Sequence, residues 1–447
     1  MNRKYFGTDG IRGRAGTHPI TPEFAERLGR ALTRVLAAGA GHHPLIAIGR
    51  DTRGSGPALE GALAAGISSA GSGVRLLGVL PTPGVAALVV EEGLAAGAVI
   101  SASHNPAADN GIKFFSGEGR KLPDETELAI EREIDNPGPS AAAPGEIAAV
   151  QDSATRYVDH SLLSLPRGFS LRGMKIAVDC ANGASSATTP AALERLGADA
   201  AVFHASPDGT NINAGCGSTV AAEISRLVKE TGAHVGIAHD GDADRVLLCD
   251  ETGEPLDGDE LLAMAALELL GRGELAGNTL VATVMSNLGL DEAVEEAGGR
   301  VIRSAVGDRY VLEAMQAGGF ILGGEQSGHI IFARHGMCGD GLVAALQILR
   351  LMAESGKPLG ELRKVLRKYP QAQRNLAVKS KPPLEELPEV QAAIKAAEQA
   401  VSPRGRILVR YSGTEPKLRI LLEGRDGGAL EKHADLIADA VQTTIGV

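Results

Sequence analysis

The sequence predicts an α/β protein: three tandem, related α/β domains with mainly parallel sheets, followed by a smaller C-terminal α+β domain. Three observations predict this architecture. Short apolar runs alternate with helical patterns in the order strand, helix, strand, helix, strand, and this order occurs three times. A polar, glycine-rich loop follows the third strand of each copy, and the pattern changes near residue 370. Such alternation is typical of parallel sheets covered by helices on both faces.

The first copy is expected to contain three strands joined by two helices. Its apolar runs have the length of strands and end at glycine or polar residues, whereas the segments between them have helical spacing. The strands are Leu45–Gly49, Val74–Val79 and Ala98–Ser101, and the helices are Pro57–Ala70 and Gly84–Glu92.

The second and third copies follow the same order. The second has strands Lys175–Asp179, Ala200–His204 and His234–Ala238, with helices Thr189–Leu196 and Val220–Thr231. The third has strands Thr279–Val284, Arg300–Ser304 and Phe320–Gly323, with helices Leu290–Ala297 and Asp308–Gln316.

The C-terminal segment has another order. It predicts a strand, a helix, a hairpin and a closing helix: Leu376–Val378, Pro388–Ala400, Ile407–Tyr411 with Leu418–Glu423, and Ala429–Thr443. A proline- and glycine-rich stretch from Asn136 to Gly145 reads as a linker. We therefore expect four domains, at residues 1–152, 153–254, 255–370 and 371–447.

Composition excludes several function classes. The net charge of the 447 residues is −11, and such a chain repels nucleic acid and anionic membranes. Aromatic residues make up 3% and Trp is absent, which disfavours base stacking. The four cysteines form no CxxC pair, so neither a disulfide framework nor a zinc site is expected. The first residues lack the apolar core of a signal peptide, and a soluble cytoplasmic protein is expected.

Three polar loops carry the candidate chemistry. In open α/β sheets, ligands bind beyond the carboxyl ends of the strands, so loops at equivalent places indicate one cleft at the domain junction. The loops are residues 101–106 (SASHNP), 239–245 (HDGDADR) and 323–329 (GGEQSGH). Residues 306–310 (VGDRY) are a further candidate lining loop.

The second loop predicts a metal site. Asp240, Asp242 and Asp244 stand at alternate positions, and hard divalent cations prefer carboxylate oxygens. The spacing resembles an EF-hand, but Arg245 stands where that motif needs glycine, and strands flank the loop. Mg²⁺ with an open position for phosphate fits better than Ca²⁺.

Ser103 is the candidate nucleophile, because it follows a buried strand and precedes the turn formed by Asn105 and Pro106. His104 is either its base or a hydrogen-bonding neighbour. Lys113 and Arg12 are candidate cations for a developing negative charge, although either could be a surface charge.

The segment 410–419 (RYSGTEPKLR) has the chemistry of a phosphate cradle, since arginine binds phosphate bidentately and glycine allows close backbone approach. Glu325 and Ser327 suit sugar hydroxyls, and His329 is either a proton-transfer group or a hydrogen-bond partner. No Walker-type GxxxxGK[ST] run occurs, so a nucleotide-driven kinase lacks its usual phosphate grip.

Together these motifs resemble the α-D-phosphohexomutases along nearly the whole chain. Five motifs follow the family order: residues 6–13 (FGTDGIRG), 103–106 (SHNP), 240–245 (DGDADR), 324–329 (GEQSGH) and 410–419. Gln326 stands where the mannose- and glucose-phosphate branches usually carry Met, which favours the glucosamine-phosphate branch.

The resemblance implies a role for each candidate residue. Ser103 is the phosphoserine, and Mg²⁺ is bound by Asp240, Asp242, Asp244 and a phosphoserine oxygen. Lys113 and His329 are linked to proton transfer, and Arg12 and His104 lie at the phosphoserine. Glu325 and Ser327 contact the sugar. The residues implied to hold the non-reacting phosphate are Arg410, Ser412, Gly413, Thr414 and Arg419.

The implied reaction is the interconversion of glucosamine 6-phosphate and glucosamine 1-phosphate, with glucosamine 1,6-bisphosphate as intermediate and activator. It would feed UDP-N-acetylglucosamine synthesis. The expected partner is a small phosphosugar, without nucleic acid or membrane, and a homodimer is left open. The alternatives are the same chemistry on mannose or glucose phosphates, a phosphatase, and a non-catalytic sugar-phosphate-binding regulator.

Overall fold

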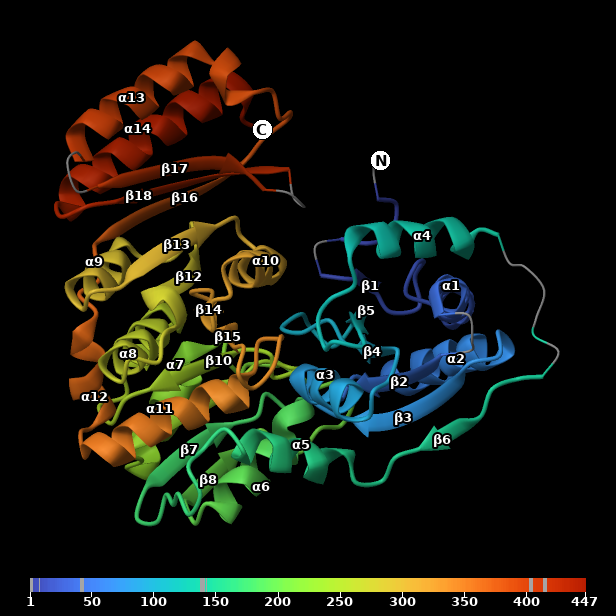
Figure 1. Ribbon diagram of the computed structural model, residues 1–447. Helices are drawn as coiled ribbons and strands as arrows, with labels where there is room; N and C mark the ends of the chain where they lie inside the picture. The colour runs from blue at the N-terminus through green and yellow to red at the C-terminus, as the bar shows by residue number, and fades with distance from the viewer. Residues whose placement is uncertain are drawn as a thin grey trace. The chain divides into compact units, whose positions relative to one another are not determined.

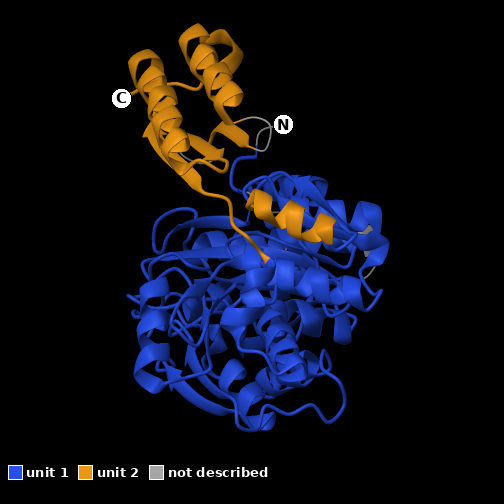
Figure 2. Ribbon diagram, turned by 90° about the vertical axis from the view of Figure 1, so that its left-hand side faces the viewer, with its two compact units in different colours: residues 1–285, 297–365 blue, residues 286–296, 366–447 orange. Residues whose placement is uncertain are grey.

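A computed structural model describes residues 3–7, 9–40, 44–136, 141, 143–401, 405–412 and 416–447. By compactness the chain divides into two units (Figure 2). Unit 1 comprises residues 1–285 and 297–365, and unit 2 comprises residues 286–296 and 366–447. Among the described residues, none of the helices is long and apolar enough to cross a membrane.

The first sheet of unit 1 has six strands, and Figure 1 labels them. Strand β2 pairs in parallel with β3 and β4, and β3 with β6, whereas β5 pairs antiparallel with β4 and β1. The order is β1 (Ile11–Arg14), β5 (Asp109–Ser116), β4 (Ala96–Ile100), β2 (Leu45–Arg50), β3 (Gly73–Val79) and β6 (Ile147–Ala149).

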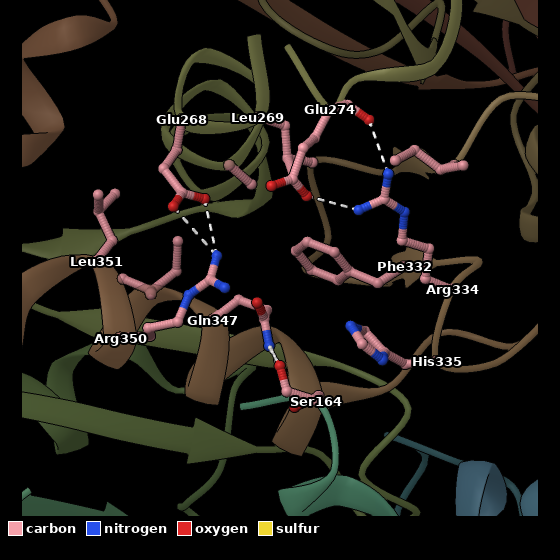
Figure 3. Close-up of a pocket in the computed structure, with 13 residues that line it drawn as sticks. Ser164, Glu268, Leu269, Glu274, Phe332, Arg334, His335, Gln347, Arg350 and Leu351 are labelled. Carbon is pink, nitrogen blue, oxygen red and sulfur yellow. Dashed lines mark hydrogen bonds and ion pairs between the residues drawn. The ribbon is translucent and has the colours of Figure 1, made fainter. Parts of the chain in front are cut away.

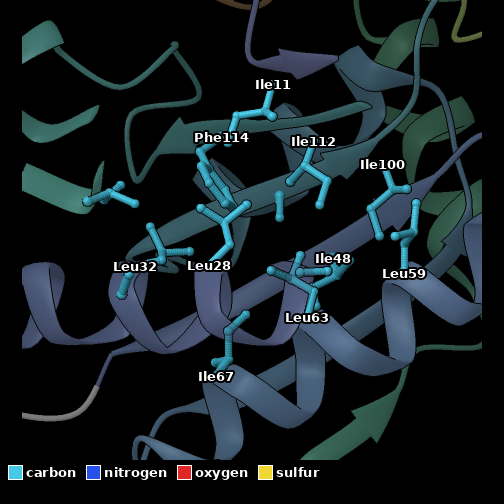
Figure 4. Close-up of a cluster of buried hydrophobic side chains, with 14 of the residues drawn as sticks. Ile11, Leu28, Leu32, Ile48, Leu59, Leu63, Ile67, Ile100, Ile112 and Phe114 are labelled. Atoms are coloured by element: carbon cyan, nitrogen blue, oxygen red, sulfur yellow. The ribbon is translucent and has the colours of Figure 1, made fainter. Parts of the chain in front are cut away.

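Helices cover both faces of this sheet. On one face, α1 (Pro22–Ala40) and α2 (Gly56–Ser69) enclose a buried cluster (Figure 4). Ile48 and Ile100 of the sheet contribute to it. The alternate residues of β2 and β4 face the other way, towards α3 (Thr82–Glu91), because a Cβ on Gly49 or Gly97 would meet Val85. The remaining helix of this domain is α4 (Asp124–Ile134).

Two further sheets complete unit 1. The second is parallel around β7 and ends in antiparallel strands, in the order β11 (Pro255–Leu256), β10 (Val246–Cys249), β9 (Val235–His239), β7 (Lys175–Asp179) and β8 (Asp199–Phe203). The third has the order β13 (Arg300–Ser304), β12 (Thr279–Thr283), β14 (Leu322–Gly324) and β15 (Ile330–Phe332), with only β15 antiparallel. The helices of these segments are α5 (Ser153–Leu162), α6 (Thr188–Arg195), α7 (Ala221–Thr231), α8 (Gly258–Gly271), α10 (Asp308–Gly318), α11 (Gly341–Ser355) and α12 (Leu359–Leu362).

Unit 2 is an antiparallel sheet with helices packed on it. The order is β16 (Gln371–Ala377), β18 (Lys417–Glu423) and β17 (Arg406–Tyr411). Helices α13 (Pro388–Val401) and α14 (Gly427–Ile445) bury their apolar residues in one core with this sheet. Helix α9 (Leu288–Glu296) also belongs to unit 2, although in the sequence it lies between β12 and β13 of unit 1.

The predicted fold class is confirmed, and the structure adds one feature to each repeat. Strands β5, β10 and β15 pair antiparallel with β4, β9 and β14, so each polar loop connects two paired strands. Such a loop is held at both ends. The four domain boundaries stay a prediction, and residues 137–140 and 142 of the predicted linker lie outside the described residues.

Candidate active site

The loop between β4 and β5, residues 101–108, carries the candidate nucleophile and is called the nucleophile loop. It holds Ser103 in a strained, buried position. Ser103 is 1% exposed and has a φ of +52°, in the left-handed region that non-glycine residues rarely adopt. Its backbone N donates to Ser101 Oγ at 2.8 Å. Its Oγ donates to Asp240 Oδ2 at 2.6 Å. The nucleophile loop therefore meets the loop of the Asp triad, residues 240–245, which is called the metal loop. The sequence predicted that these two loops would lie in one cleft.

Close approach of the two loops requires Gly241. A Cβ at this position would lie 2.6 Å from the Ser103 carbonyl oxygen. Real Cβ atoms do not come that close to a backbone atom, so any larger residue would push the loops apart. Glycine is therefore needed here for packing rather than for a positive φ.

The predicted metal residues lie together. Asp240, Asp242 and Asp244 are 0%, 0% and 5% exposed, and their carboxylate oxygens lie within 4.8 Å of one another. Two negative charges about 4 Å apart repel by roughly 4 kcal/mol at an effective dielectric constant of about 20. Burial raises the pKa of Asp240 well above its usual range, and the charges of Asp244 and Asp242 raise it further. The carboxylates of the triad therefore repel one another, and a cation bound between them would offset that repulsion.

The donor set fits a divalent cation. Asp242 Oδ1 and Asp244 Oδ1 are buried and accept no hydrogen bond from the described residues. Buried carboxylate oxygens are normally satisfied, so oxygens left open on neighbouring residues indicate ligands for an ion. The other oxygen of Asp242 accepts from Thr82 Oγ1 at 2.6 Å, which orients the carboxylate. No sequence pattern pointed to Thr82, because it lies in an apolar helix.

Lys113 reaches the same triad from β5. Its Nζ lies 2.7 Å from Asp242 Oδ2 and 3.4 Å from Asp244 Oδ2, and the side chain is 4% exposed. Burial alone would lower the pKa of Lys113, but Asp242, Asp9 and Asp244 outweigh it and raise the pKa well above its usual value. Lys113 is therefore a charged member of the site rather than a surface residue.

His104 lies beside the nucleophile. Its Nδ1 is 3.2 Å from Ser103 Oγ and 3.3 Å from Arg245 Nη1. Since arginine only donates, Nδ1 acts as an acceptor. Burial lowers the pKa of His104, and the cations Arg245 and Arg12 lower it further. This environment favours a neutral imidazole whose lone pair faces Ser103, so the sequence alternatives of base and hydrogen-bonding neighbour both stay open.

A chain of alternating positive and negative side chains connects the first repeat, which carries Ser103, to the third repeat, which carries His329. Arg12 pairs with Asp9, and Asp9 lies 2.5 Å from Lys121 Nζ. Lys121 also pairs with Asp308 at 2.6 Å, and Asp308 lies 3.8 Å from His329 Nε2. Burial lowers the pKa of Lys121, but Asp308 and Asp9 outweigh it and raise the pKa above its usual value. The chain of charges thus joins β1 to α10.

Replacing Lys121 with Met is expected to lower the free energy of unfolding by about 3–5 kcal/mol, because it leaves the carboxylates of Asp9 and Asp308 without their shared cation. Chemical denaturation of the purified variant measures this loss. Lys4→Met is the matched control, since Lys4 pairs with Asp135 at an exposed site, where solvent screens the ion pair and little stability is lost with it. Equal losses in the two variants would contradict the buried role of Lys121.

The sugar loop joins β14 to β15. Glu325 Oε1 accepts from Gly307 N at 3.0 Å, Ser327 is exposed, and His329 is 3% exposed. Gly339 N donates to His329 Nε2 at 3.1 Å, while His329 Nδ1 lies 3.7 Å from Asp244 Oδ2. Unit 1 therefore places His329 beside the metal loop and leaves Ser327 open to a ligand.

The predicted phosphate cradle lies in unit 2. Arg410 and Arg419 stand directly opposite each other on β17 and β18, so both side chains project from the same face of the sheet. Burial lowers the pKa of Arg410, and the charge of Arg419 lowers it further. Like charges in such a pair repel each other, and an anionic ligand between them would offset that repulsion. Ser412 is buried nearby, whereas Gly413 and Thr414 lie outside the described residues.

A cavity of about 150 Å³ lies elsewhere in unit 1 (Figure 3). Its arginines are already neutralised: Arg350 Nη2 donates to both oxygens of Glu268 at 3.0–3.1 Å, and Arg334 pairs with Glu274 at 2.6 Å. The residues that line the cavity differ from all predicted site residues. We assign no ligand to it.

A buried serine in contact with a buried acid triad, at the ends of mainly parallel sheets, is typical of an enzyme site for phosphoryl chemistry. The chain belongs to the phosphoglucomutase/phosphomannomutase family. The family's alpha/beta/alpha domains I, II and III match residues 3–139, 156–253 and 257–369, and its C-terminal domain matches residues 374–440.

Relatives of this chain carry a more specific name. A "phosphoglucosamine mutase" of Syntrophotalea carbinolica is 49% identical, over 100% of this chain and 99% of the relative. One of Geobacter metallireducens is 50% identical over 99% of both chains. Among solved structures, a Burkholderia thailandensis phosphoglucomutase/phosphomannomutase family protein has a TM-score of 0.81 at 24% identity, covering 98% of this chain and 99% of that one. This structural likeness shows the shared fold.

Proposed function

We propose that this chain interconverts glucosamine 6-phosphate and glucosamine 1-phosphate through a phosphoserine at Ser103. The observation that carries the proposal is the 2.6 Å contact between Ser103 Oγ and Asp240, within a buried triad whose carboxylates could hold a metal ion. The full-length relatives named phosphoglucosamine mutase support glucosamine as the sugar.

In the first half-reaction, phosphoserine 103 transfers its phosphoryl group to the free hydroxyl of the sugar phosphate. The Oγ–P bond breaks, a bond from phosphorus to the sugar oxygen forms, and glucosamine 1,6-bisphosphate results. The hydroxyl proton passes to a base at the sugar end of the site. His329, which lies at Asp244, is the candidate base. Lys113 lies at the same carboxylate, but its raised pKa keeps it charged, so its part in proton transfer would be that of a proton donor. His104 Nδ1 lies 3.2 Å from the Ser103 oxygen that leaves, and the charges of Arg245 and Arg12 act on His104.

Asp240, Asp242 and Asp244, with a phosphoserine oxygen, would hold Mg²⁺, which offsets negative charge on the transferring group. Thr82 orients Asp242, Asp242 and Asp244 each keep one oxygen that accepts no hydrogen bond from the described residues, and Asp240 contacts Ser103 Oγ. Family membership agrees with this metal, because the phosphohexomutases generally depend on magnesium.

In the second half-reaction, the bisphosphate returns its other phosphoryl group to Ser103. The sugar therefore presents each end in turn, and its non-reacting phosphate must be held in both orientations. Arg410 and Arg419, with Ser412, Gly413 and Thr414, are proposed to hold that phosphate, while Glu325 and Ser327 bind sugar hydroxyls. Two arginine forks on one sheet face suit a phosphate that arrives in two orientations.

Arg410→Ala is expected to raise KM for the sugar phosphate by about 10–150-fold, because a charge-assisted hydrogen bond to phosphate is worth about 1.5–3 kcal/mol. Steady-state kinetics measures this change. Arg374→Ala is the control, since Arg374 lies on the neighbouring β16 and pairs with Glu431 and Asp435. An unchanged KM in Arg410→Ala would remove Arg410 from the proposed cradle.

A comparison of kcat/KM on the 6-phosphates of glucosamine, glucose and mannose tests the proposed substrate. Mg²⁺ and a trace of the matching sugar bisphosphate are present in each assay. Preference for glucosamine is expected, whereas a higher kcat/KM on glucose or mannose phosphate would favour the other mutase branches. Intact-mass detection of a phosphoryl group on the purified chain separates a mutase from a non-catalytic binder. A homodimer and a cytoplasmic location stay predictions.

A further inference from the structure

A guanidinium lies at the base of the nucleophile loop, in the segment that follows β2. Arg53 is 0% exposed, as is its carboxylate partner Asp51. Arginine has five N–H donors, and Arg53 uses all of them inside unit 1. Its Nε donates to Asp51 Oδ2 at 2.9 Å. The other four N–H groups donate to four backbone carbonyls of the loop and of the first residue of β5: Ser103 at 2.9 Å, Asn105 at 2.8 Å, Pro106, and Asp109 at 2.9 Å.

Converging carbonyls need such a cation. Each carbonyl oxygen carries partial negative charge, and a buried carbonyl without a donor costs about 1–3 kcal/mol in general. A planar guanidinium satisfies several carbonyls at once, because its N–H groups point outward in one plane. A lysine ammonium has three N–H groups on a single nitrogen and cannot reproduce that pattern. The loop conformation is therefore matched to arginine.

The same side chain reaches Ser103 by a second route. Asp51 Oδ2, which accepts from Arg53 Nε, also accepts from Ser101 Oγ at 2.6 Å. Ser101 Oγ in turn accepts from Ser103 N at 2.8 Å. The peptide groups on both sides of the Ser103 Cα are thus fixed, one through its carbonyl oxygen and one through its N–H. That arrangement holds the residue at its φ of +52°.

The segment that carries Arg53 is itself fixed to neighbouring loops. Thr52 Oγ1 donates to Asn182 O at 2.5 Å, and Gly54 N donates to Gly209 O at 2.8 Å. Asn213 Nδ2 reinforces the arginine by donating to Ser103 O at 2.9 Å and to Asn105 O at 3.1 Å. Asn213 belongs to the second repeat, which also carries the Asp triad. Its hydrogen bonds therefore attach the nucleophile loop to the repeat that contains the metal loop.

We infer that Arg53 is a positioning residue of the proposed phosphoryl transfer, which holds Ser103 in the left-handed conformation that directs its Oγ at Asp240. The inference rests on the proposed phosphoserine chemistry. Arg53 acts through the loop geometry and does not touch the reacting atoms, and its charge is balanced by Asp51.

The test compares Arg53→Lys with Arg363→Lys. Arg363 is the matched control because it also joins buried carboxylates, Asp250 at 2.9 Å and Glu260 at 2.6 Å, away from the nucleophile loop. The readout is the rate at which dephosphorylated protein takes up a phosphoryl group from glucose 1,6-bisphosphate, followed by intact mass. Steady-state kcat and KM and the thermal unfolding temperature are measured alongside.

Arg53→Lys is expected to lower the uptake rate and kcat by about 100-fold, the usual effect of a displacement near 1 Å, with KM nearly unchanged. Arg363→Lys is expected to keep both rates within about twofold. Uptake at the wild-type rate by Arg53→Lys overturns the inference, and so does an equal loss of rate in the two variants. No uptake by the wild-type chain overturns the proposed function and this inference with it.

Asn213→Ala provides the second variant if Arg53→Lys does not fold. It removes donors to the same two carbonyls, of Ser103 and Asn105, and leaves the buried ion pair in place. A fall in uptake of about tenfold with an unchanged unfolding temperature is expected from the loss of one such anchor. An unchanged uptake rate would overturn the inference.

Discussion

Replacing Ser103 with Ala is expected to lower kcat for the mutase reaction by at least about 10⁴-fold, because no other group can carry the phosphoryl group between the two half-reactions. The fold should tolerate the change. Ala keeps the Cβ and the backbone bonds of Ser103 and loses only the hydroxyl that donates to Asp240. Steady-state turnover with Mg²⁺ and sugar bisphosphate present measures the loss, and intact mass shows whether the variant still takes up a phosphoryl group.

Ser69→Ala is the matched control for this substitution. Ser69 lies at the end of α2, where its Oγ donates to Gly66 O at 2.9 Å. It is expected to keep wild-type turnover and phosphoryl uptake. Normal turnover by Ser103→Ala would show that the phosphoserine route is wrong, and phosphoryl uptake by that variant would place the acceptor on another residue.

The parallel strands were predictable because their apolar runs are local signals. Strands β7 (Lys175–Asp179) and β13 (Arg300–Ser304) begin and end at the predicted residues. The antiparallel partners were not placed by residue, although a strand was expected after the Asp240–Arg245 loop, where β10 lies. Strand β5 carries buried Asn110 and Lys113, which interrupt its apolar pattern, while β10 and β15 have four and three residues and are too short to show a period.

The grouping of the site residues was also predictable in part. Ser103 and the Asp triad occur in loops after equivalent strands, and parallel topology brings such loops to one edge. Lys121 and Arg53 were not predicted. Each stands beside another charged or polar residue in a stretch that resembles a surface turn, and its burial depends on carboxylates and carbonyls far away in the sequence. Local sequence cannot show which cation such distant groups will enclose.

The buried charges of unit 1 explain why those cations matter. The nucleophile, the triad and the histidines lie among carboxylates that burial would otherwise drive to the neutral form. Lys113 forms ion pairs with Asp242 and Asp244. Lys121 forms ion pairs with Asp9 and Asp308, and Arg53 forms one with Asp51. These lysines and the arginine are committed to protein groups, whereas the oxygens of Asp242 and Asp244 that accept no hydrogen bond from the described residues are available to an ion.

Loss of the divalent cation proposed at the Asp triad is the second change that is expected to lower kcat strongly. Asp240→Asn keeps the shape of the side chain but removes the negative charge that faces Ser103 Oγ, and it reduces the triad to two carboxylates. We expect kcat to fall by at least about 10³-fold and the affinity for Mg²⁺ to fall by about 10–100-fold. Chelation of divalent cations should abolish wild-type turnover, and added Mg²⁺ should restore it.

Titration calorimetry with Mg²⁺ on the phosphorylated protein measures the affinity for Mg²⁺ separately from kcat. Asp199→Asn serves as the control, because Asp199 is an exposed acid at the start of β8. It should bind Mg²⁺ and turn over as the wild type does. Asp240→Asn is expected to lose affinity even without sugar, since its carboxylate would be a ligand in the resting enzyme. Wild-type Mg²⁺ affinity in Asp240→Asn, or turnover that survives chelation, would contradict the assignment of the triad as the metal site.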